Sequence, residues 1–288
     1  MNDARDLRWL ALPLLTVWLV TQCYSGLWHD SVLYSFQAMA HLHPELLGND
    51  LYLRYGSQDQ YSVFPRLYAI LIRWLGLENA AELLTLAMQA LLLYAIWRLA
   101  VRLMPHNVAV FALAAAICLP NGYGAREVFH YIESFVTPRM AAEALTLCAL
   151  AGWLRSPRSW WSLLLWLGAC VLHPLMALAG AVMAVWLFLL DGRRRLAALL
   201  VVLGLATVLL ASRFDSWRMD DYWFATIRAG LHYLMLGDWN EPSFVTTLLP
   251  LVLLGCAVRA LAGTLPGQAA AAALATGVSG LVLTYLGA

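Results

Sequence analysis

Solid apolar runs alternate with short polar segments along the whole chain. The runs are about 15–20 residues long, and a helix needs about 20 apolar residues to cross the hydrocarbon core of a bilayer. The strands of an outer-membrane barrel would instead show short segments in which apolar and polar residues alternate. The pattern therefore predicts an all-α fold and, more narrowly, a polytopic helical membrane protein.

The lengths of the runs predict about nine transmembrane helices. Two of them share the apolar stretch 159–190, where His173-Pro174 marks the turn between two short limbs. The segment YSVFPRLYAILIRWLG, 61–76, is short and amphipathic, so we expect a helix that lies in the membrane interface. The other spans are expected near 9–25, 80–103, 107–120, 139–154, 196–212, 245–262 and 268–287.

Arginine predicts the orientation of the chain, because all 18 of its Lys and Arg residues are arginine. Basic residues flank the cytoplasmic ends of membrane spans. With a cytoplasmic N-terminus, the clusters that close the spans all fall on the cytoplasmic side. These clusters are Arg98 and Arg102, Arg155 and Arg158, Arg193–Arg195, and Arg259. The polar loops 26–79, 122–138 and 213–244 then face the opposite side, and we expect the inner membrane of a bacterium.

Composition agrees with this class, because 62% of the residues are hydrophobic and only 12% are charged. Soluble domains carry about 45–50% apolar and about 25% charged residues. The net charge of +1 argues against nucleic acid as a partner. The five cysteines lack CxxC spacing, so neither a metal site nor a disulfide framework is indicated. The first span lacks a small-residue cleavage site, so we expect a retained membrane anchor.

The first polar loop contains the strongest candidate for chemistry. Asp30 lies where the first span should leave the bilayer, next to His29, and a carboxylate held at a membrane surface is costly to desolvate. Such a group can act as general base toward a hydroxyl or amine acceptor. His29, Asp50 and Asp59 are further candidates for contacts with a substrate or a metal. The simpler alternative for each loop carboxylate is that water solvates it.

The second polar loop places Glu127, His130 and Glu133 at positions i, i+3 and i+6, which share one broad face of a helix. These side chains could bind a divalent metal or contact a substrate, but their spacing is not a tight ligand signature. We therefore favour a hydrogen-bonded loop helix. Arg139 follows Pro138 at the start of the next span, where it would stand at the outer membrane surface beside lipid phosphate.

His173 lies at the tip of the predicted hairpin 159–190. A lone histidine in apolar surroundings is more often a structural residue than a functional one. Here the following proline and the position at the outer surface favour contact with a phosphate or pyrophosphate leaving group.

Taken together, these features resemble the GT-C superfamily of membrane glycosyltransferases, which use polyprenyl-phosphate-linked sugars. Asp30 matches the acidic position that the family has just after its first span. The sequence FPRLYAILIRWLG is similar to the family's interfacial helix, which ends in glycine. The hairpin with His173 at its tip is similar to spans five and six, and the loop 213–243 is similar to the one after span seven.

The resemblance implies a GT-C-like catalytic module over 1–212, with seven spans and the large first outer loop 26–79. An outer loop over 213–244 and two further spans over 245–288 follow. It also implies transfer, with inversion, of a sugar from a polyprenyl-phosphate donor to a lipid, glycan or protein acceptor on the extracytoplasmic side. Asp30 would be the base, while Arg139 and His173 would bind the donor phosphate.

The first loop has no Asp-Glu pair or Asp-x-Asp motif, so the participation of Mg²⁺ or Mn²⁺ is left open. Two other functions remain as alternatives. A lipid or solute transporter would place polar residues at mid-membrane and show internal repeats, whereas here the polar residues crowd the outer loops. A non-catalytic scaffold that keeps the fold is the second alternative. Membrane lipids are expected partners, and the sequence does not indicate a protein partner.

Overall fold

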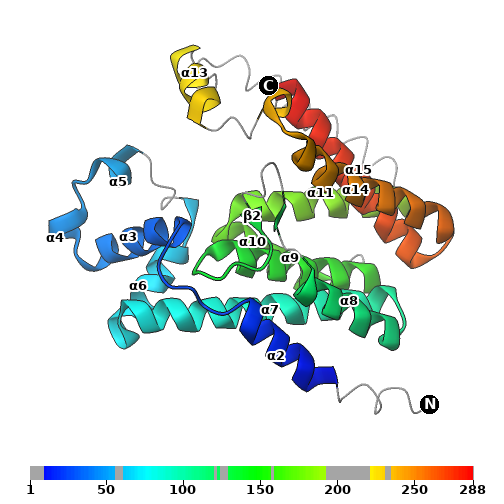
Figure 1. Ribbon diagram of the computed structural model, residues 1–288, viewed down its shortest axis with the longest axis horizontal. Helices are drawn as coiled ribbons and strands as arrows, with labels where there is room; N and C mark the ends of the chain where they lie inside the picture. The colour runs from blue at the N-terminus through cyan, green and yellow to red at the C-terminus, as the bar shows by residue number, and fades with distance from the viewer. Residues whose placement is uncertain are drawn as a thin grey trace. The chain divides into compact units, whose positions relative to one another are not determined.

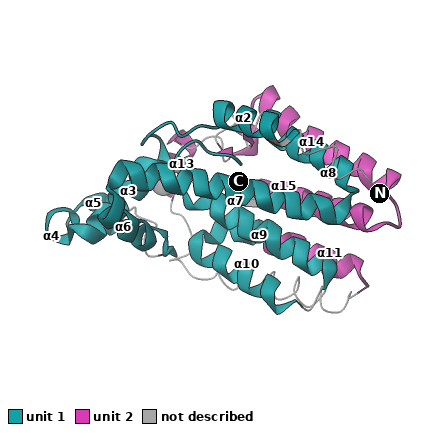
Figure 2. Cartoon of the chain, turned by 90° about the horizontal axis from the view of Figure 1, so that it is seen from below, with its two compact units in different colours: residues 1–121, 131–180 teal, residues 122–130, 181–288 magenta. Residues whose placement is uncertain are grey.

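A computed structural model describes residues 10–55, 61–119, 122–123, 129–156, 159–192, 221–230 and 235–287 of the chain. Helices make up nearly all of these residues (Figure 1), which confirms the predicted all-α class. The only strands among them are an antiparallel pair, β1 (Gly122–Tyr123) and β2 (Phe129–His130). The chain divides into two compact units (Figure 2): unit 1 comprises 1–121 and 131–180, and unit 2 comprises 122–130 and 181–288.

Unit 1 is a helical bundle built on the long helix α7 (Leu77–Leu103). This helix packs against α6 (Phe64–Leu75), α8 (His106–Cys118) and α9 (Pro138–Arg155), and α9 packs in turn against α10 (Trp160–Leu172). The other elements of the unit are α2 (Ala11–Thr21), α3 (Asp30–Leu42), α4 (Pro44–Leu47), α5 (Leu51–Tyr55) and the first turns of α11 (Pro174–Leu190).

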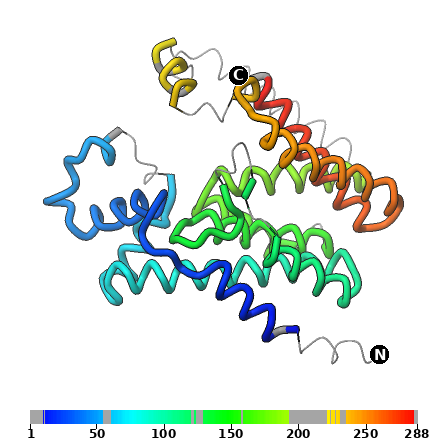
Figure 3. Tube along the Cα trace, in the orientation of Figure 1, coloured from blue at the N-terminus to red at the C-terminus, as the bar shows by residue number. Residues whose placement is uncertain are grey.

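Helix α6 forms because its apolar residues recur with helical spacing. Phe64, Tyr68 and Ile72 lie four residues apart and are buried, and α3 packs against this helix (Figure 3). Gly76 ends the helix with φ +78°, a conformation that favours glycine. The short amphipathic helix predicted within 61–76 is therefore confirmed as Phe64–Leu75. Its location in the membrane interface stays a prediction.

Small residues let α9 approach α10 and α11 closely. A Cβ on Gly152 of α9 would collide with Ser162 Oγ of α10. A Cβ on Gly180 of α11 would likewise collide with the Thr146 side chain of α9. His173 is the single residue between α10 and α11, so the predicted turn at this position is confirmed.

Unit 2 is centred on two helices that pack together, α14 (Glu241–Ala260) and α15 (Leu265–Gly287). Asn240 caps α14, because its Oδ1 accepts a hydrogen bond from the Ser243 N–H at 3.1 Å. The unit also contains α13 (Asp221–Gly230), the 3₁₀ helix η6 (Leu236–Asp238), the β1–β2 pair and the rest of α11.

Three described helices, α7, α14 and α15, are long and apolar enough to cross a membrane. Four shorter apolar helices, α2, α8, α10 and α11, have 10–17 residues. These helices support the class of membrane protein, whereas they do not establish the nine predicted spans. The predicted span 196–212 lies outside the described residues, as do 213–220 and 231–234 of the loop 213–244.

The first apolar helix is shorter than predicted, since α2 covers Ala11–Thr21 and the chain over 22–25 is not helical. Tertiary hydrogen bonds engage the backbone there instead. The Gln22 carbonyl oxygen accepts from Gln89 Nε2 at 2.8 Å. The Ser25 N–H donates to the Ser134 carbonyl oxygen, also at 2.8 Å. These bonds hold the chain after α2 against α7 and against the segment that precedes α9.

Candidate functional site

Two of the predicted site residues, Asp30 and Arg139, are in direct contact. Asp30 is the first residue of α3 and Arg139 the second residue of α9, so each lies in the first turn of its helix. Arg139 Nη1 donates to Asp30 Oδ2 at 2.6 Å. The Thr137 hydroxyl caps α9 by accepting from the Arg139 N–H at 3.4 Å. The helix start therefore directs the guanidinium to the carboxylate, in a charge-assisted bond of the strong kind.

A second carboxylate, Glu133, holds the same guanidinium. Arg139 Nε donates to Glu133 Oε1 at 2.9 Å, and Arg139 Nη2 lies 2.5 Å from the same oxygen. The side chains of Arg139 and Glu133 are 7% and 1% exposed, so the pair is almost completely removed from water. Burial raises the pKa of Glu133 to about 7, although the Arg139 charge opposes this shift. Glu133 Oε2 is buried and has no hydrogen-bond partner among the described residues.

Gln89 fixes the segment that carries Glu133, and it was not among the residues predicted from the sequence. Its Nε2 donates to the carbonyl oxygens of Glu133 and Gln22, both at 2.8 Å. Its Oε1 accepts from Trp18 Nε1 at 3.1 Å. Gln89 is completely buried within α7. The signal that could have found it is an amide side chain inside an apolar run, since such a group is costly there unless it is paired.

His29 lies beside the second oxygen of Asp30. His29 Nδ1 is 3.3 Å from Asp30 Oδ1, and the His29 ring packs against Phe135 and Trp28. His29 has φ +53°, which is uncommon for a residue other than glycine, although histidine adopts it more readily than most. The Asp30 side chain remains 31% exposed, so its carboxylate can be reached by a substrate.

A cavity of about 370 Å³ lies in unit 1 where the chain before α6 meets the end of α10. Ser62 Oγ donates to the Leu172 carbonyl oxygen at 2.6 Å, and the Val63 N–H donates to the Val171 carbonyl oxygen at 3.1 Å. These bonds hold the two segments together at the cavity. Its lining consists of Tyr34, Gln37, Tyr61, Ser62, Pro138, Leu172, His173, Pro174 and Leu175.

The cavity adjoins the charged cluster. Tyr34 lies about one helical turn after Asp30 on α3, and Pro138 directly precedes Arg139. His173 lines the same cavity as Pro138. Burial and the Arg139 charge lower the pKa of His173, whereas the Asp30 charge raises it. The structure therefore brings Asp30, Arg139 and His173 to one region of unit 1, although they come from three separate segments of the sequence.

His173 is buried at this cavity and caps α11. Its Nδ1 accepts a hydrogen bond from the Met176 N–H at 3.4 Å. Burial, together with the Arg139 charge, lowers the pKa of His173 to about 4, so the ring is neutral at pH 7. Because Nδ1 is an acceptor, the neutral ring carries its proton on Nε2. His173 can thus donate a hydrogen bond but brings no positive charge.

Two helix N-termini also meet the cavity, because Pro138 and Pro174, the first residues of α9 and α11, both line it. The N-terminal end of a helix carries about half an elementary positive charge and favours an anion nearby. The helix ends therefore add positive potential to a region where Arg139 is already paired with two carboxylates.

No contact among the described residues joins Asp50, a further candidate of the first loop, to the cluster of Asp30, Arg139 and Glu133. Asp50 Oδ1 accepts from the Tyr52 N–H at 2.8 Å, which caps the short helix α5. Asp59 of the first loop and Glu127 of the second loop lie outside the described residues. Across the described ranges, no group of three or more His, Cys, Asp and Glu side chains could hold a metal ion.

The predicted loop helix through Glu127, His130 and Glu133 is wrong. His130 is exposed in strand β2, where it pairs with Gly122 of β1. Glu133 is instead buried against Arg139. Over 129–133 the spacing did not produce a helix, because strand pairing engages His130 and the buried ion pair engages Glu133.

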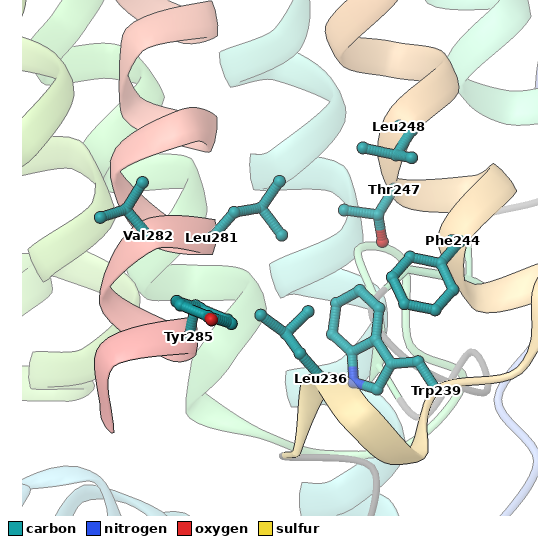
Figure 4. A pocket seen from close by; sticks show the side chains of 8 residues that line it. All are labelled: Leu236, Trp239, Phe244, Thr247, Leu248, Leu281, Val282 and Tyr285. Atoms are coloured by element: carbon teal, nitrogen blue, oxygen red, sulfur yellow. The ribbon is translucent and has the colours of Figure 1, made fainter. Parts of the chain in front are cut away.

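Unit 2 has an apolar cavity of about 340 Å³ between η6, α14 and α15. Figure 4 shows side chains from all three elements around it. The lining consists of Leu236, Trp239, Phe244, Thr247, Leu248, Leu281, Val282 and Tyr285. None of these described side chains is charged.

No known protein family matches the chain, and neither curated proteins nor solved structures yield a match.

Proposed function

We propose that the chain is an integral membrane glycosyltransferase of the GT-C type. It would move a sugar from a polyprenyl-phosphate donor to a lipid, glycan or protein acceptor on the extracytoplasmic side. The observation that carries this proposal is the 2.6 Å contact between Asp30 and Arg139 beside a cavity that His173 lines. A carboxylate, a hydrogen-bond donor and positive helix ends around one cavity are the groups that transfer from a phosphate leaving group requires.

Asp30 is the base in this mechanism. Its Oδ2 is held by Arg139, and the partly exposed carboxylate removes the proton from the acceptor hydroxyl or amine. The acceptor atom then forms a bond to C1 of the sugar while the bond from C1 to the phosphate oxygen breaks. Polyprenyl phosphate leaves with the electron pair, and the configuration at C1 is inverted.

The departing phosphate is stabilised by His173 and by the N-termini of α9 and α11. His173 donates from Nε2, and the helix ends contribute their partial positive charge. Direct contact between the phosphate and Arg139, as expected from the sequence, requires the guanidinium to share its donors with Asp30 and Glu133. We therefore propose that the main role of Arg139 is to orient the Asp30 carboxylate.

The same proposal includes the finer topology. Nine spans, with the N-terminus in the cytoplasm of a bacterial cell, direct the loop that contains Asp30 and the turn at His173 to the extracytoplasmic side. The arginine clusters support this orientation. The helices α7, α14 and α15 are consistent with three of the spans.

A test uses proteoliposomes of the full chain with synthetic polyprenyl-phosphate hexoses and pentoses and an envelope extract as acceptor. Release of polyprenyl phosphate is measured. Asp30→Asn should lower the rate about 10²–10⁴-fold, as loss of a general base does. Asp191→Asn, the same change at an exposed residue after α11, should leave the rate unchanged. Full activity of Asp30→Asn, or no release from any donor by folded wild-type protein, would overturn the proposal.

A non-catalytic membrane scaffold is the second candidate, and one observation favours it. Arg139 is buried between two carboxylates, which is also how a structural ion pair is built. Under this function, Asp30→Asn would lower the midpoint of thermal unfolding, and wild-type protein would release no polyprenyl phosphate.

A further inference from the structure

The two carboxylates contact different parts of the Arg139 guanidinium. Glu133 Oε1 accepts from the edge formed by Nε and Nη2, whereas Asp30 Oδ2 accepts from Nη1. The guanidinium is planar and its donors form a rigid fork, so fixing one edge also fixes the direction of the remaining N–H groups. The position of Nη1 therefore depends on Glu133.

Both backbone polar groups of Glu133 are engaged by other residues. Its backbone carbonyl oxygen accepts from Gln89 Nε2 at 2.8 Å, and its N–H contacts Met140 Sδ at 3.3 Å. Its side chain is 1% exposed, so water does not compete for the carboxylate. A side chain anchored in this way can orient a partner more firmly than Asp30, which is partly exposed.

We propose that Glu133 is a positioning residue of the site: it holds the Nε–Nη2 edge of Arg139 so that Nη1 is presented to Asp30, and its charge competes with Asp30 for the same cation. This inference rests on the proposed function insofar as Asp30 acts as a base. The geometry of the triad, by contrast, does not depend on that function.

The competition gives the site a dependence on pH. When Glu133 is neutral, Arg139 pairs with Asp30 alone and holds its carboxylate tightly. When Glu133 is ionised, one cation is shared between two carboxylates, and Asp30 is held less tightly and is more available to the acceptor. Several groups surround Glu133 and Asp30. They are Arg139 and Thr137 at the start of α9, Tyr34 on α3, Gln89 on α7, and His173 at the turn before α11.

The first test does not need activity. Infrared difference spectra of the full chain are recorded while the pH is lowered from 9 to 5. A buried carboxyl group should take up its proton near pH 7 in wild-type protein. This signal should be absent in Glu133→Gln and present in Glu82→Gln, which makes the same change at an exposed position of α7. A signal that persists in Glu133→Gln, or no uptake near pH 7, would overturn the inference.

The second test separates positioning from a general role in stability. Glu133→Gln keeps an oxygen that can accept from Arg139, whereas Glu133→Leu does not. Glu133→Leu should lower polyprenyl phosphate release about 100-fold, since small misplacements of a reacting group have effects of this size. Glu133→Gln should keep the rate that wild-type protein has below pH 7 and should lack the rise in rate around pH 7. Equal losses in both variants, with the pH profile unchanged, would contradict positioning.

The two tests fail in different ways. If wild-type protein releases no polyprenyl phosphate but the infrared signal near pH 7 depends on Glu133, then the proposed function fails and the coupling of Glu133 to Arg139 stands. If release occurs and depends on Asp30, but the infrared signal does not depend on Glu133, then the transferase stands and the role of Glu133 is wrong.

Discussion

The two units each contain a cavity of similar volume, about 370 Å³ in unit 1 and about 340 Å³ in unit 2, but the linings differ in chemistry. The unit 1 cavity adjoins Asp30, Arg139 and Glu133 and is lined by His173. The unit 2 cavity is lined by apolar and aromatic side chains with one threonine. Volume alone therefore does not indicate a reactive site. The paired charges and hydrogen-bonding side chains distinguish the cavity of unit 1.

The long apolar helices of the two units also differ in the share of their residues that is buried. The apolar part of α7 is 33% buried, whereas that of α14 is 6% and that of α15 is 17% buried. Among the described residues, a larger share of α7 is therefore buried than of α14 or α15. Substitutions should consequently have larger effects in unit 1 than in unit 2.

The largest effect on stability is expected from Arg139→Met, which leaves Glu133 buried without its cation. Breaking a buried ion pair in this way costs about 3–5 kcal/mol in free energy of unfolding. Denaturant titration in detergent would measure the loss. Arg66→Met on the exposed side of α6 is the matched control and should have little effect. Wild-type stability of Arg139→Met would mean that the cluster in unit 1 does not hold the unit together.

A smaller and directly comparative effect is expected from truncating one leucine in each unit. Leu92→Ala removes a side chain that is 1% exposed in the core of unit 1, and it should cost about 2–5 kcal/mol. Leu281→Ala, at the unit 2 cavity, should cost about 1 kcal/mol or less, because surrounding lipid chains are as apolar as leucine. Equal losses in the two variants, measured in the same detergent, would remove the difference between the units.

The smallest effect at neutral pH is expected from His173→Asn, because asparagine can also cap α11. Below pH 6.5, an unfolded histidine binds a proton that the buried His173 does not bind until the pH approaches 4. Wild-type stability should therefore fall between pH 6.5 and 4, by about 1.4 kcal/mol for each unit by which the two pKa values differ. Midpoints of thermal unfolding across this range should fall less steeply in His173→Asn. Parallel curves would show that His173 is not the titrating group.

The candidate site could be predicted only in part. Asp30, Arg139 and His173 were identified because each lies at the edge of an apolar run, where a polar side chain is unusual. Glu133 was a candidate for a different reason, as part of a predicted helix that does not form. Its contact with Arg139 depends on how the chain before α9 turns into the core, and local spacing carries no information about that turn.

Sequence alone determined the elements whose hydrogen bonds are local. The amphipathic spacing and Gly76 determined α6, and the His173-Pro174 pair determined the break between α10 and α11, because helix formation depends on neighbouring residues. Tertiary structure decided which charges meet. Arg139 and Asp30 are 109 residues apart, and Gln89 reaches the Glu133 backbone across 44 residues. Such pairs form only when tertiary packing brings distant segments together. Burial of Arg139 and Gln89 then makes a partner necessary, and no local pattern of residues contains that information.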